Sequence, residues 1–221
     1  MSDLTLIIGN KNYSSWSLRP WLLLKQAGIP FREVRIPLYG ADTRMQILKY
    51  SPSGKVPALV DGDLTVWESL AICEHVAERF PDKALWPADL KARALARAAA
   101  SEMHAGFSAL RNNMPMNVRR SFPTHGRTPE VLQDIERIAA LWQDCRSRYG
   151  DGGPFLFGRF SVADAMFAPV AFRFQTYVVD LPSSARAYTD TLLALPAMRE
   201  WATVGRAETE IVASYEFDTA P

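Results

Sequence analysis

The distribution of alanine divides this chain into two parts of different character. Residues 1–82 contain five alanines, whereas residues 83–221 contain twenty-four. Alanine favours helices more than any other residue, while strand formers and turn signals dominate the first part. Proline interrupts helical periodicity in residues 81–83 and again in residues 86–89. We therefore expect one domain over residues 1–82 and an all-helical domain over residues 88–221.

Within the first part, strand-like and helical segments follow one another between turn signals. Strands are predicted over residues 4–8, 31–36, 56–60 and 64–67, and helices over residues 18–27, 43–50 and 68–80. The first helix has both ends specified, because Ser17 is a good N-cap, Pro20 lies in a first turn that needs no amide donor, and Gly28 follows the end. The order of these elements predicts an α/β domain.

The second part shows helical patterns only. Helices are predicted over residues 91–110 and 129–149, from Ser161 toward Val178, and in two shorter segments that close the chain. Ser161 and Asp164 have the spacing of a capping box, in which each residue satisfies a free backbone amide of the other. Loss of Ser161 should cost about 1 kcal/mol or somewhat more.

Charge and cysteine content exclude several classes of protein. The chain has 25 Lys and Arg residues against 24 Asp and Glu residues, so no surplus of positive charge is available for a nucleic acid. No apolar run reaches the roughly 18 residues of a membrane span, and Met1-Ser2-Asp3 lacks the basic start of a signal peptide. Two cysteines form no disulfide framework, so we expect a cytoplasmic protein. Metal sites, P-loops and Rossmann fingerprints are not expected, because their spacings are missing.

A polar loop between the first predicted strand and the first predicted helix is the first candidate site. It contains Ser14, Ser15 and Ser17, with Trp16 among them. Ligands of open α/β sheets usually bind beyond the carboxyl ends of the strands, and the free amides at a helix start favour anions. A sulfur anion would be stabilised here. The alternative is that the serines only cap the helix.

Two further candidates stand at the start of the hairpin and of the third helix. Pro57 begins a strand after a glycine-containing turn, where a cis Val56-Pro57 bond can occur, although a trans proline on an edge strand is the commoner case. Glu68 and Ser69 open a helix, where such a pair most often forms a cap without a ligand. Each candidate is weak alone, and the combination of all three is much more specific.

Taken together, these candidates and the alanine-rich second part resemble the glutathione transferase family over essentially the whole chain. The resemblance implies a thioredoxin-like N-terminal domain followed by an all-helical C-terminal domain, glutathione as co-substrate, and a homodimer. Ser14 and Ser17 stand where a thioredoxin fold carries Cys-x-x-Cys, so dithiol chemistry is not expected. The Ser-Ser-x-Ser run, followed by Arg19, is most similar to the zeta class.

The resemblance also implies roles for individual residues, namely Ser14, Ser15, Lys55, Val56, Pro57, Glu68 and Ser69. Ser14 is implied as the catalytic hydroxyl that donates to the glutathione sulfur, with Ser15 beside it. Lys55 and the backbone of Val56 would hold the tripeptide like an added strand, with a cis bond at Pro57. Glu68 and Ser69 would bind its γ-glutamyl end.

One hydroxyl and one helix start suffice for this chemistry. A free thiol has a pKa of about 8.5, and lowering it by about two requires roughly 2.7 kcal/mol in favour of the anion. A hydrogen bond to a charged acceptor supplies about 1.5 to 3 kcal/mol and a partly buried helix start up to about 2 kcal/mol. Glutathione, and not serine, is then the nucleophile.

The electrophile is expected between the two domains. Its pocket would be lined by Trp16, His104, Phe107 and Arg111, and apolar walls favour a hydrophobic electrophile. Two departures from the zeta pattern weaken an assignment as maleylacetoacetate isomerase. Trp16 stands where that pattern has a cysteine, and Thr176 stands where it has a substrate-binding arginine if Val179-Asp180-Leu181 anchors the alignment. Arg173 lies about one turn before Thr176.

Three functions stay open on this reasoning. They are conjugation of glutathione to a hydrophobic electrophile, as in detoxification, a zeta-type isomerisation, and glutathione binding or protein interaction without catalysis. We favour the transferase, because a pure scaffold has no need for the full set of site residues.

Overall fold

The computed structural model describes residues 4–217. The expectation of no signal peptide rests on Met1-Ser2-Asp3, which lies outside the described residues. A four-stranded mixed sheet in the order β2-β1-β3-β4 forms the N-terminal domain together with three helices. The strands are β1 (Leu4–Ile8), β2 (Arg32–Arg35), β3 (Ala58–Asp61) and β4 (Leu64–Trp67), and the helices are α1 (Ser15–Gln26), α2 (Thr43–Leu48) and α3 (Ser69–Arg79). β2 is parallel to β1, and β3 is antiparallel to both β1 and β4.

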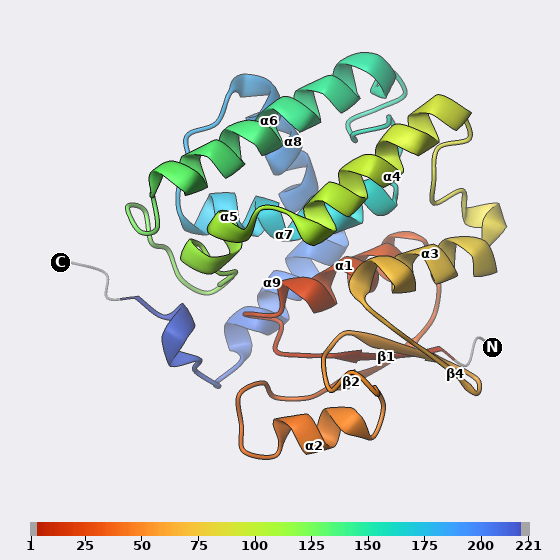
Figure 1. Cartoon of the computed structure of the whole chain (residues 1–221), viewed down its shortest axis with the longest axis vertical. Coiled ribbons are helices and arrows are strands. Elements are labelled where there is room, and N and C mark those ends of the chain that lie inside the picture. Colours follow the sequence, from red (N-terminus) through yellow and green to blue (C-terminus); the bar gives the residue numbers. More distant parts are fainter. Residues whose placement is uncertain (1–3, 218–221) are drawn as a thin grey trace.

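The central strand β1 lies between two hydrophobic clusters, because successive side chains of a strand point to opposite faces. Leu6 and Ile8 belong to the large cluster that includes α1 and α3. Ile7 packs on the other face with Ile47 of α2 and with Ala58. Figure 1 shows α1 and α3 on one side of the sheet and α2 on the other. This thioredoxin-like arrangement confirms the predicted fold of the first domain.

Helix α1 begins three residues before the predicted start, at Ser15 and not at Leu18. Its N-cap is Ser14, whose hydroxyl oxygen accepts the backbone N–H of Ser17 at 3.4 Å. The prediction that Ser17 is the cap is therefore wrong. Ser17 is buried inside the helix, where its hydroxyl oxygen accepts the N–H of Gly9 at 3.1 Å. Pro20 consequently lies within the helix and not in its first turn.

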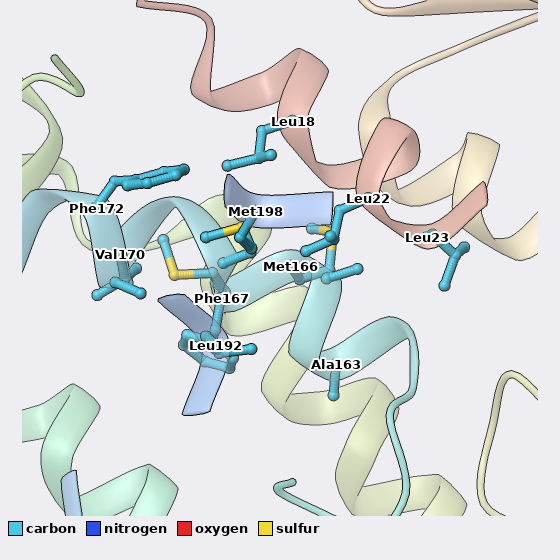
Figure 2. Packing of buried hydrophobic residues seen from close by; sticks show 14 of the residues in the cluster. Leu18, Leu22, Leu23, Ala163, Met166, Phe167, Val170, Phe172, Leu192 and Met198 are labelled. Atoms are coloured by element: carbon cyan, nitrogen blue, oxygen red, sulfur yellow. The ribbon is translucent and has the colours of Figure 1, made fainter. Parts of the chain in front are cut away.

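The C-terminal domain is all helical, as predicted. Its elements are the 3-10 turn η1 (Pro81–Lys83) that leads into it, α4 (Leu90–Ala105), α5 (Ser108–Asn113), α6 (Pro129–Tyr149), α7 (Val162–Thr176), α8 (Ser183–Ala194), α9 (Pro196–Ala207) and the 3-10 turn η2 (Ala213–Tyr215). Helix α7 is the central element, since its side chains are buried along nearly the whole length. Figure 2 shows Leu18 and Leu22 of α1, Met166 and Phe167 of α7, and Met198 of α9 in one cluster. Within residues 4–217, no helix is long and apolar enough to cross a membrane.

The helix predicted over residues 91–110 is interrupted. Helix α4 ends at Ala105, and α5 begins at Ser108. Phe107 between them adopts a left-handed backbone conformation with φ of 59°, which a continuous right-handed helix does not allow. The residues that follow Phe107 therefore leave the axis of α4.

The capping box at the start of α7 is confirmed. The buried carboxylate of Asp164 accepts the backbone N–H of Ser161 at 2.8 Å and its hydroxyl at 2.9 Å. The same carboxylate accepts the N–H of Leu156 at 3.0 Å and the hydroxyl of Tyr188 at 2.9 Å. Asp164 thus fixes the start of the central helix to two neighbouring segments.

The segment after α9 returns to the N-terminal domain. The carboxylate of Glu208 accepts the backbone N–H of Lys11 at 2.8 Å and that of Asn12 at 3.0 Å. Further along, Glu216 accepts the hydroxyl of Tyr13 at 2.5 Å. The loop that precedes α1 is therefore held from the far end of the chain.

Candidate active site

Two adjoining cavities open beside the first turn of α1. The larger has a volume of about 600 Å³ and is lined by both domains, with Ser14, Ser15, Trp16, Lys55 and Val56 from the first and Arg111 and Arg173 from the second. The smaller has a volume of about 400 Å³ and is lined by Trp16, Ser53, Lys55, Val56, Pro57, Glu68 and Ser69. Trp16, Lys55 and Val56 line both cavities. The fold thus gathers segments that are up to 202 residues apart, from Tyr13 to Tyr215, around one cleft.

The Ser14 hydroxyl stands at the N-terminus of α1 and faces the larger cavity. It donates to the hydroxyl oxygen of Ser17 at 2.7 Å. Ser17 in turn accepts the N–H of Gly9, the residue that follows β1. This chain of hydrogen bonds fixes Ser14 to the end of the central strand. The free amides and positive dipole of the helix start favour an anion at this point.

Ser15, the first residue of α1, contacts a buried arginine of the helical domain. Nη2 of Arg173 donates to the Ser15 hydroxyl oxygen at 3.3 Å, and Nε of Arg173 donates to the carbonyl oxygen of Met114 at 2.8 Å. Only 4% of the Arg173 surface is exposed. Burial and the nearby charge of Arg111 lower the pKa of Arg173 to about 10, so the guanidinium stays charged at neutral pH.

Trp16 forms a wall between the two cavities. Its ring lies 4.3 Å from the guanidinium carbon of Arg19 and 4.8 Å from that of Arg111, measured to the ring centroid. The edge-to-face contact with the ring of His104 has a centroid distance of 5.4 Å. Such cation–π contacts with two arginines fix the indole ring in place.

The start of α3 supplies the far end of the smaller cavity. Glu68 precedes the helix with φ of 69°, a left-handed conformation that is uncommon outside glycine. Its carboxylate lies 3.6 Å from Nε2 of His104, and about half of its side chain is exposed. Ser69 is buried and accepts a hydrogen bond from Nη1 of Arg19 at 3.2 Å. Burial and the charge of Arg19 lower the pKa of His104, which favours a neutral imidazole.

The segment before β3 offers a backbone without a partner. The Val56-Pro57 bond is cis, as the family resemblance implied, and not trans, which is the commoner case for a proline at the start of an edge strand. Within the described part of the chain, the backbone N–H and carbonyl of Val56 form no hydrogen bond. Lys55 lies on the wall of both cavities next to this free backbone. An extended peptide in the cleft can therefore pair with Val56 in the manner of an added strand.

The expected electrophile wall is present only in part. Trp16 and Arg111 line the larger cavity, whereas His104 and Phe107 are absent from the lining of both cavities. Phe107 is 7% exposed and packs in the core, because its left-handed backbone turns the chain away from α4. His104 faces Glu68 and the edge of the Trp16 ring instead.

Sequence reasoning missed other residues of the larger cavity, among them Tyr39, Arg44 and Tyr215. Arg173 was noted only for its spacing from Thr176. A clearer signal is that Arg173 is the one cation in the sequence of α7, which is apolar over residues 165–172. A cation inside such a helix is costly to bury and therefore points to a special environment. The hydroxyl of Thr176 donates to the carbonyl oxygen of Asn117 and serves the packing of the helix.

Neither cysteine takes part in the site. Cys73 and Cys145 are both buried, and burial raises the pKa of each thiol to about 12. Within residues 4–217, no group of three His, Cys, Asp or Glu side chains is placed to hold a metal ion.

Comparisons with known proteins give one consistent result. Residues 13–79 match the family described as "Glutathione S-transferase, N-terminal domain", and residues 93–203 match "Glutathione S-transferase, C-terminal domain". The chain is 27% identical to "Glutathione S-transferase Z2" of Arabidopsis thaliana over 203 residues, which cover 86% of this chain and 88% of that protein. It is 25% identical to "Probable maleylacetoacetate isomerase" of Caenorhabditis elegans over 189 residues, which cover 83% of this chain and 85% of that protein.

The fold also matches solved structures. A crystal structure of a glutathione transferase homolog from Burkholderia gl BGR1 with bound glutathione superposes with a TM-score of 0.69. The match covers 93% of this chain and 98% of that chain at 22% sequence identity. This likeness confirms the two-domain architecture.

Proposed function

Because the chain belongs to the glutathione S-transferase family, we propose that it binds glutathione and joins its sulfur to a small electrophile. The thiol of glutathione first loses its proton to solvent. The thiolate then attacks an electrophilic carbon, so that a carbon–sulfur bond forms. The bond from that carbon to a leaving group breaks, and the leaving group departs with the bonding electron pair. No step requires a metal or a redox partner.

The arrangement of the smaller cavity supports a place for the tripeptide. The free backbone of Val56 would pair with the cysteinyl residue of glutathione, next to Lys55 and the cis Pro57. Glu68 and Ser69 would hold the γ-glutamyl end at the start of α3, the carboxylate by attracting the ammonium group and the helix start by attracting the carboxylate.

The observation that carries the proposal is the position of Ser14. It is the N-cap of α1, it faces the larger cavity, and it lies next to the segment where the tripeptide would run. The hydroxyl can turn from Ser17 to a sulfur anion, and the helix start adds to the attraction. Together these two effects supply the roughly 2.7 kcal/mol that lowers a thiol pKa by about two.

The larger cavity would receive the electrophile. Trp16, Pro115 and Met116 provide apolar walls, and Arg111 lines the same cavity in contact with the ring of Trp16. A hydrophobic electrophile fits this lining. His104 and Phe107 would act at most indirectly, through the ring of Trp16 and the core.

Substitution of Ser14 tests the proposal. We expect Ser14→Ala to lower turnover of a reactive aryl halide about 10- to 150-fold, the size implied by one hydrogen bond to a charged group, with glutathione binding largely retained. Ser147→Ala on the exposed face of α6 is the control, because it lies outside both cavities. If Ser14→Ala matches the parent on every substrate, the role of Ser14 is wrong.

Calorimetry with glutathione separates the enzyme from a non-catalytic module. The transferase predicts heat of binding and thermal stabilisation of the protein at millimolar glutathione. A protein that binds glutathione and turns over no electrophile would be a binding module. A protein that shows neither heat nor thermal shift would not be a glutathione protein at all.

A zeta-type isomerase is the second candidate function, and one observation favours it. The charged side chains that line the larger cavity are Arg44, Lys55, Arg111 and Arg173, and no Asp or Glu lies among the lining residues. A cis-configured diketo acid would meet only positive charge there. Assay of such an acid with glutathione tests this candidate directly, and absence of isomerisation at millimolar acid rejects it.

We also propose a cytoplasmic homodimer with a role in detoxification, as the family resemblance implies. Buried reduced cysteines agree with a reducing compartment. Sedimentation of the purified protein at micromolar concentration tests the dimer, and a monomer mass throughout would reject it.

A further inference from the structure

Three arginines converge on the first turn of α1. Arg19 is buried within α1, Arg111 lies on α5, and Arg173 lies on α7. Within residues 4–217 their guanidinium groups donate only to carbonyl and hydroxyl oxygens and form no ion pair with a carboxylate. Burying a charge without a counter-ion is costly, so such a cluster is expected to serve an anion.

Arg173 is the member of this cluster that reaches the first turn of α1. The ionisable side chains that affect its pKa are Arg111 and the tyrosines Tyr177 and Tyr215, and no carboxylate is among them. Its only side-chain partner among the described residues is the hydroxyl of Ser15. Arg173 therefore lines the larger cavity beside Ser15 and contacts the hydroxyl of that residue directly.

The two serines that face the larger cavity differ in what their hydroxyl hydrogens do. The Ser14 hydroxyl donates to Ser17 at 2.7 Å. The Ser15 hydroxyl accepts from Arg173, and within the described residues it donates to no acceptor. Because Arg173 fixes the oxygen of Ser15 as an acceptor, the single hydrogen of that hydroxyl stays available to a ligand in the cavity.

We propose that Arg173 is a positioning residue, which orients the Ser15 hydroxyl so that Ser15 donates a second hydrogen bond to the thiolate of glutathione, beside Ser14. This inference rests on the proposed function. A hydroxyl that accepts from a guanidinium is a stronger donor, since hydrogen bonds in a chain polarise one another. The helical domain thereby contributes to a thiolate that is bound by the thioredoxin-like domain.

The test measures the pKa of bound glutathione from the ultraviolet absorbance of its thiolate as a function of pH. The proteins compared are the parent, Ser15→Ala, Arg173→Met and the double variant, each saturated with glutathione. We expect Ser15→Ala and Arg173→Met each to raise the thiol pKa by about 1 to 2, the size of one hydrogen bond to a charged group. We expect the double variant to raise it no further than Ser15→Ala alone, because both changes remove the same hydrogen bond.

The control is Arg97→Gln, a substitution of a half-exposed arginine on α4 that pairs with Glu74 outside both cavities. It should leave the thiol pKa unchanged. Arg173→Lys keeps the positive charge, so its thiol pKa should lie between that of the parent and that of Arg173→Met. A purely structural role of the side chain does not predict this intermediate value.

Several outcomes would overturn the inference. An unchanged thiol pKa in Arg173→Met, or additive shifts in the double variant, would show that Arg173 does not act through Ser15. If Arg173→Met fails to fold, Ser15→Ala decides. An unchanged thiol pKa in Ser15→Ala would show that Ser15 donates no second hydrogen bond to the thiolate. A shift in Ser14→Ala with none in Ser15→Ala or Arg173→Met rejects this inference and leaves the proposed function standing. A parent protein that binds no glutathione rejects both.

Discussion

Arg19 of α1 donates a hydrogen bond to Ser69 at the start of α3, with 3.2 Å between Nη1 and the hydroxyl oxygen. Both residues are buried, and they join the two helices whose N-termini border the cleft. The guanidinium has no ion pair within the described residues, and burial together with the charges of Arg111 and Arg173 lowers its pKa well below the usual value. The contact therefore serves the geometry of the cleft at a cost to the stability of the fold.

This cost leads to a prediction about Arg19→Met. Methionine fills a similar volume without a charge, so we expect an unfolding temperature equal to or above that of the parent and a glutathione affinity reduced about 10-fold, as Ser69 loses its partner. Thermal unfolding and calorimetry measure the two effects. A clear drop in unfolding temperature would show that Arg19 stabilises the fold.

Trp16 should report on both cavities, because its ring lines each of them. We expect glutathione to change the intrinsic fluorescence of the parent and expect Trp16→Phe to lose most of that change, although five other tryptophans remain. Trp16→Ala should lower kcat/KM for an aromatic electrophile about 5- to 30-fold, because the cation–π contacts and the apolar wall are removed. Equal loss of fluorescence change in Trp86→Phe, which lies outside both cavities, would contradict the assignment.

Glu68 should recognise the ammonium group of the γ-glutamyl end. We expect Glu68→Gln to weaken glutathione binding about 10-fold, the order of one charge-assisted hydrogen bond. An analogue that lacks the γ-glutamyl amino group should bind the parent and the variant equally. Calorimetry with both ligands measures this difference, and equal weakening for the two ligands would assign Glu68 a structural role only.

Glu216 should make stability depend on pH at the acidic end. Burial alone raises the pKa of its carboxyl, but hydrogen bonds from Tyr13, Arg119 and Arg120 outweigh burial and hold the pKa below the usual value of 4.5. A lowered folded-state pKa stabilises the protein above the unfolded value, and this contribution is lost as pH falls through the folded value. The free energy of unfolding should therefore exceed that of Glu216→Gln at pH 7.

The difference between the two proteins should shrink below about pH 4.5, where the carboxyl of Glu216 becomes protonated in the unfolded chain. Urea unfolding at a series of pH values measures it. If the difference in the free energy of unfolding between parent and variant stays constant down to pH 3, the charge of Glu216 does not contribute to stability.

The start of α1 shows which features of the site could be predicted from the sequence and which could not. Three serines compete for the N-cap, and local preference does not choose between them, since serine is favourable at each position. The choice of Ser14 depends on the turn that Asn10 forms after β1 and on the hydrogen bond from Gly9 to Ser17. The polar loop and its helix were predictable, whereas the orientation of each hydroxyl depends on packing.

The helical side of the cleft was harder to predict, because it depends on contacts between distant segments. Arg173 and Ser15 are separated by 158 residues. Local sequence cannot predict such a contact. The left-handed turn at Phe107 could not be predicted either, because phenylalanine rarely adopts that conformation and its presence therefore does not indicate a turn. The segments of the thioredoxin-like domain were more accessible, since hydrophobic periodicity and turn residues determine them locally.

The return of the chain after α9 matters to anyone who trims or tags this protein. Glu208 and Glu216 hold the backbone of Lys11 and Asn12 and the hydroxyl of Tyr13, immediately before Ser14 and the start of α1. A truncation that ends at residue 207 would leave every α-helix and strand of residues 4–207 complete and would remove the 3-10 turn η2. It would nevertheless release the loop that precedes Ser14 and Ser15, so loss of activity in the shortened protein would not test the roles proposed for the residues of the cleft.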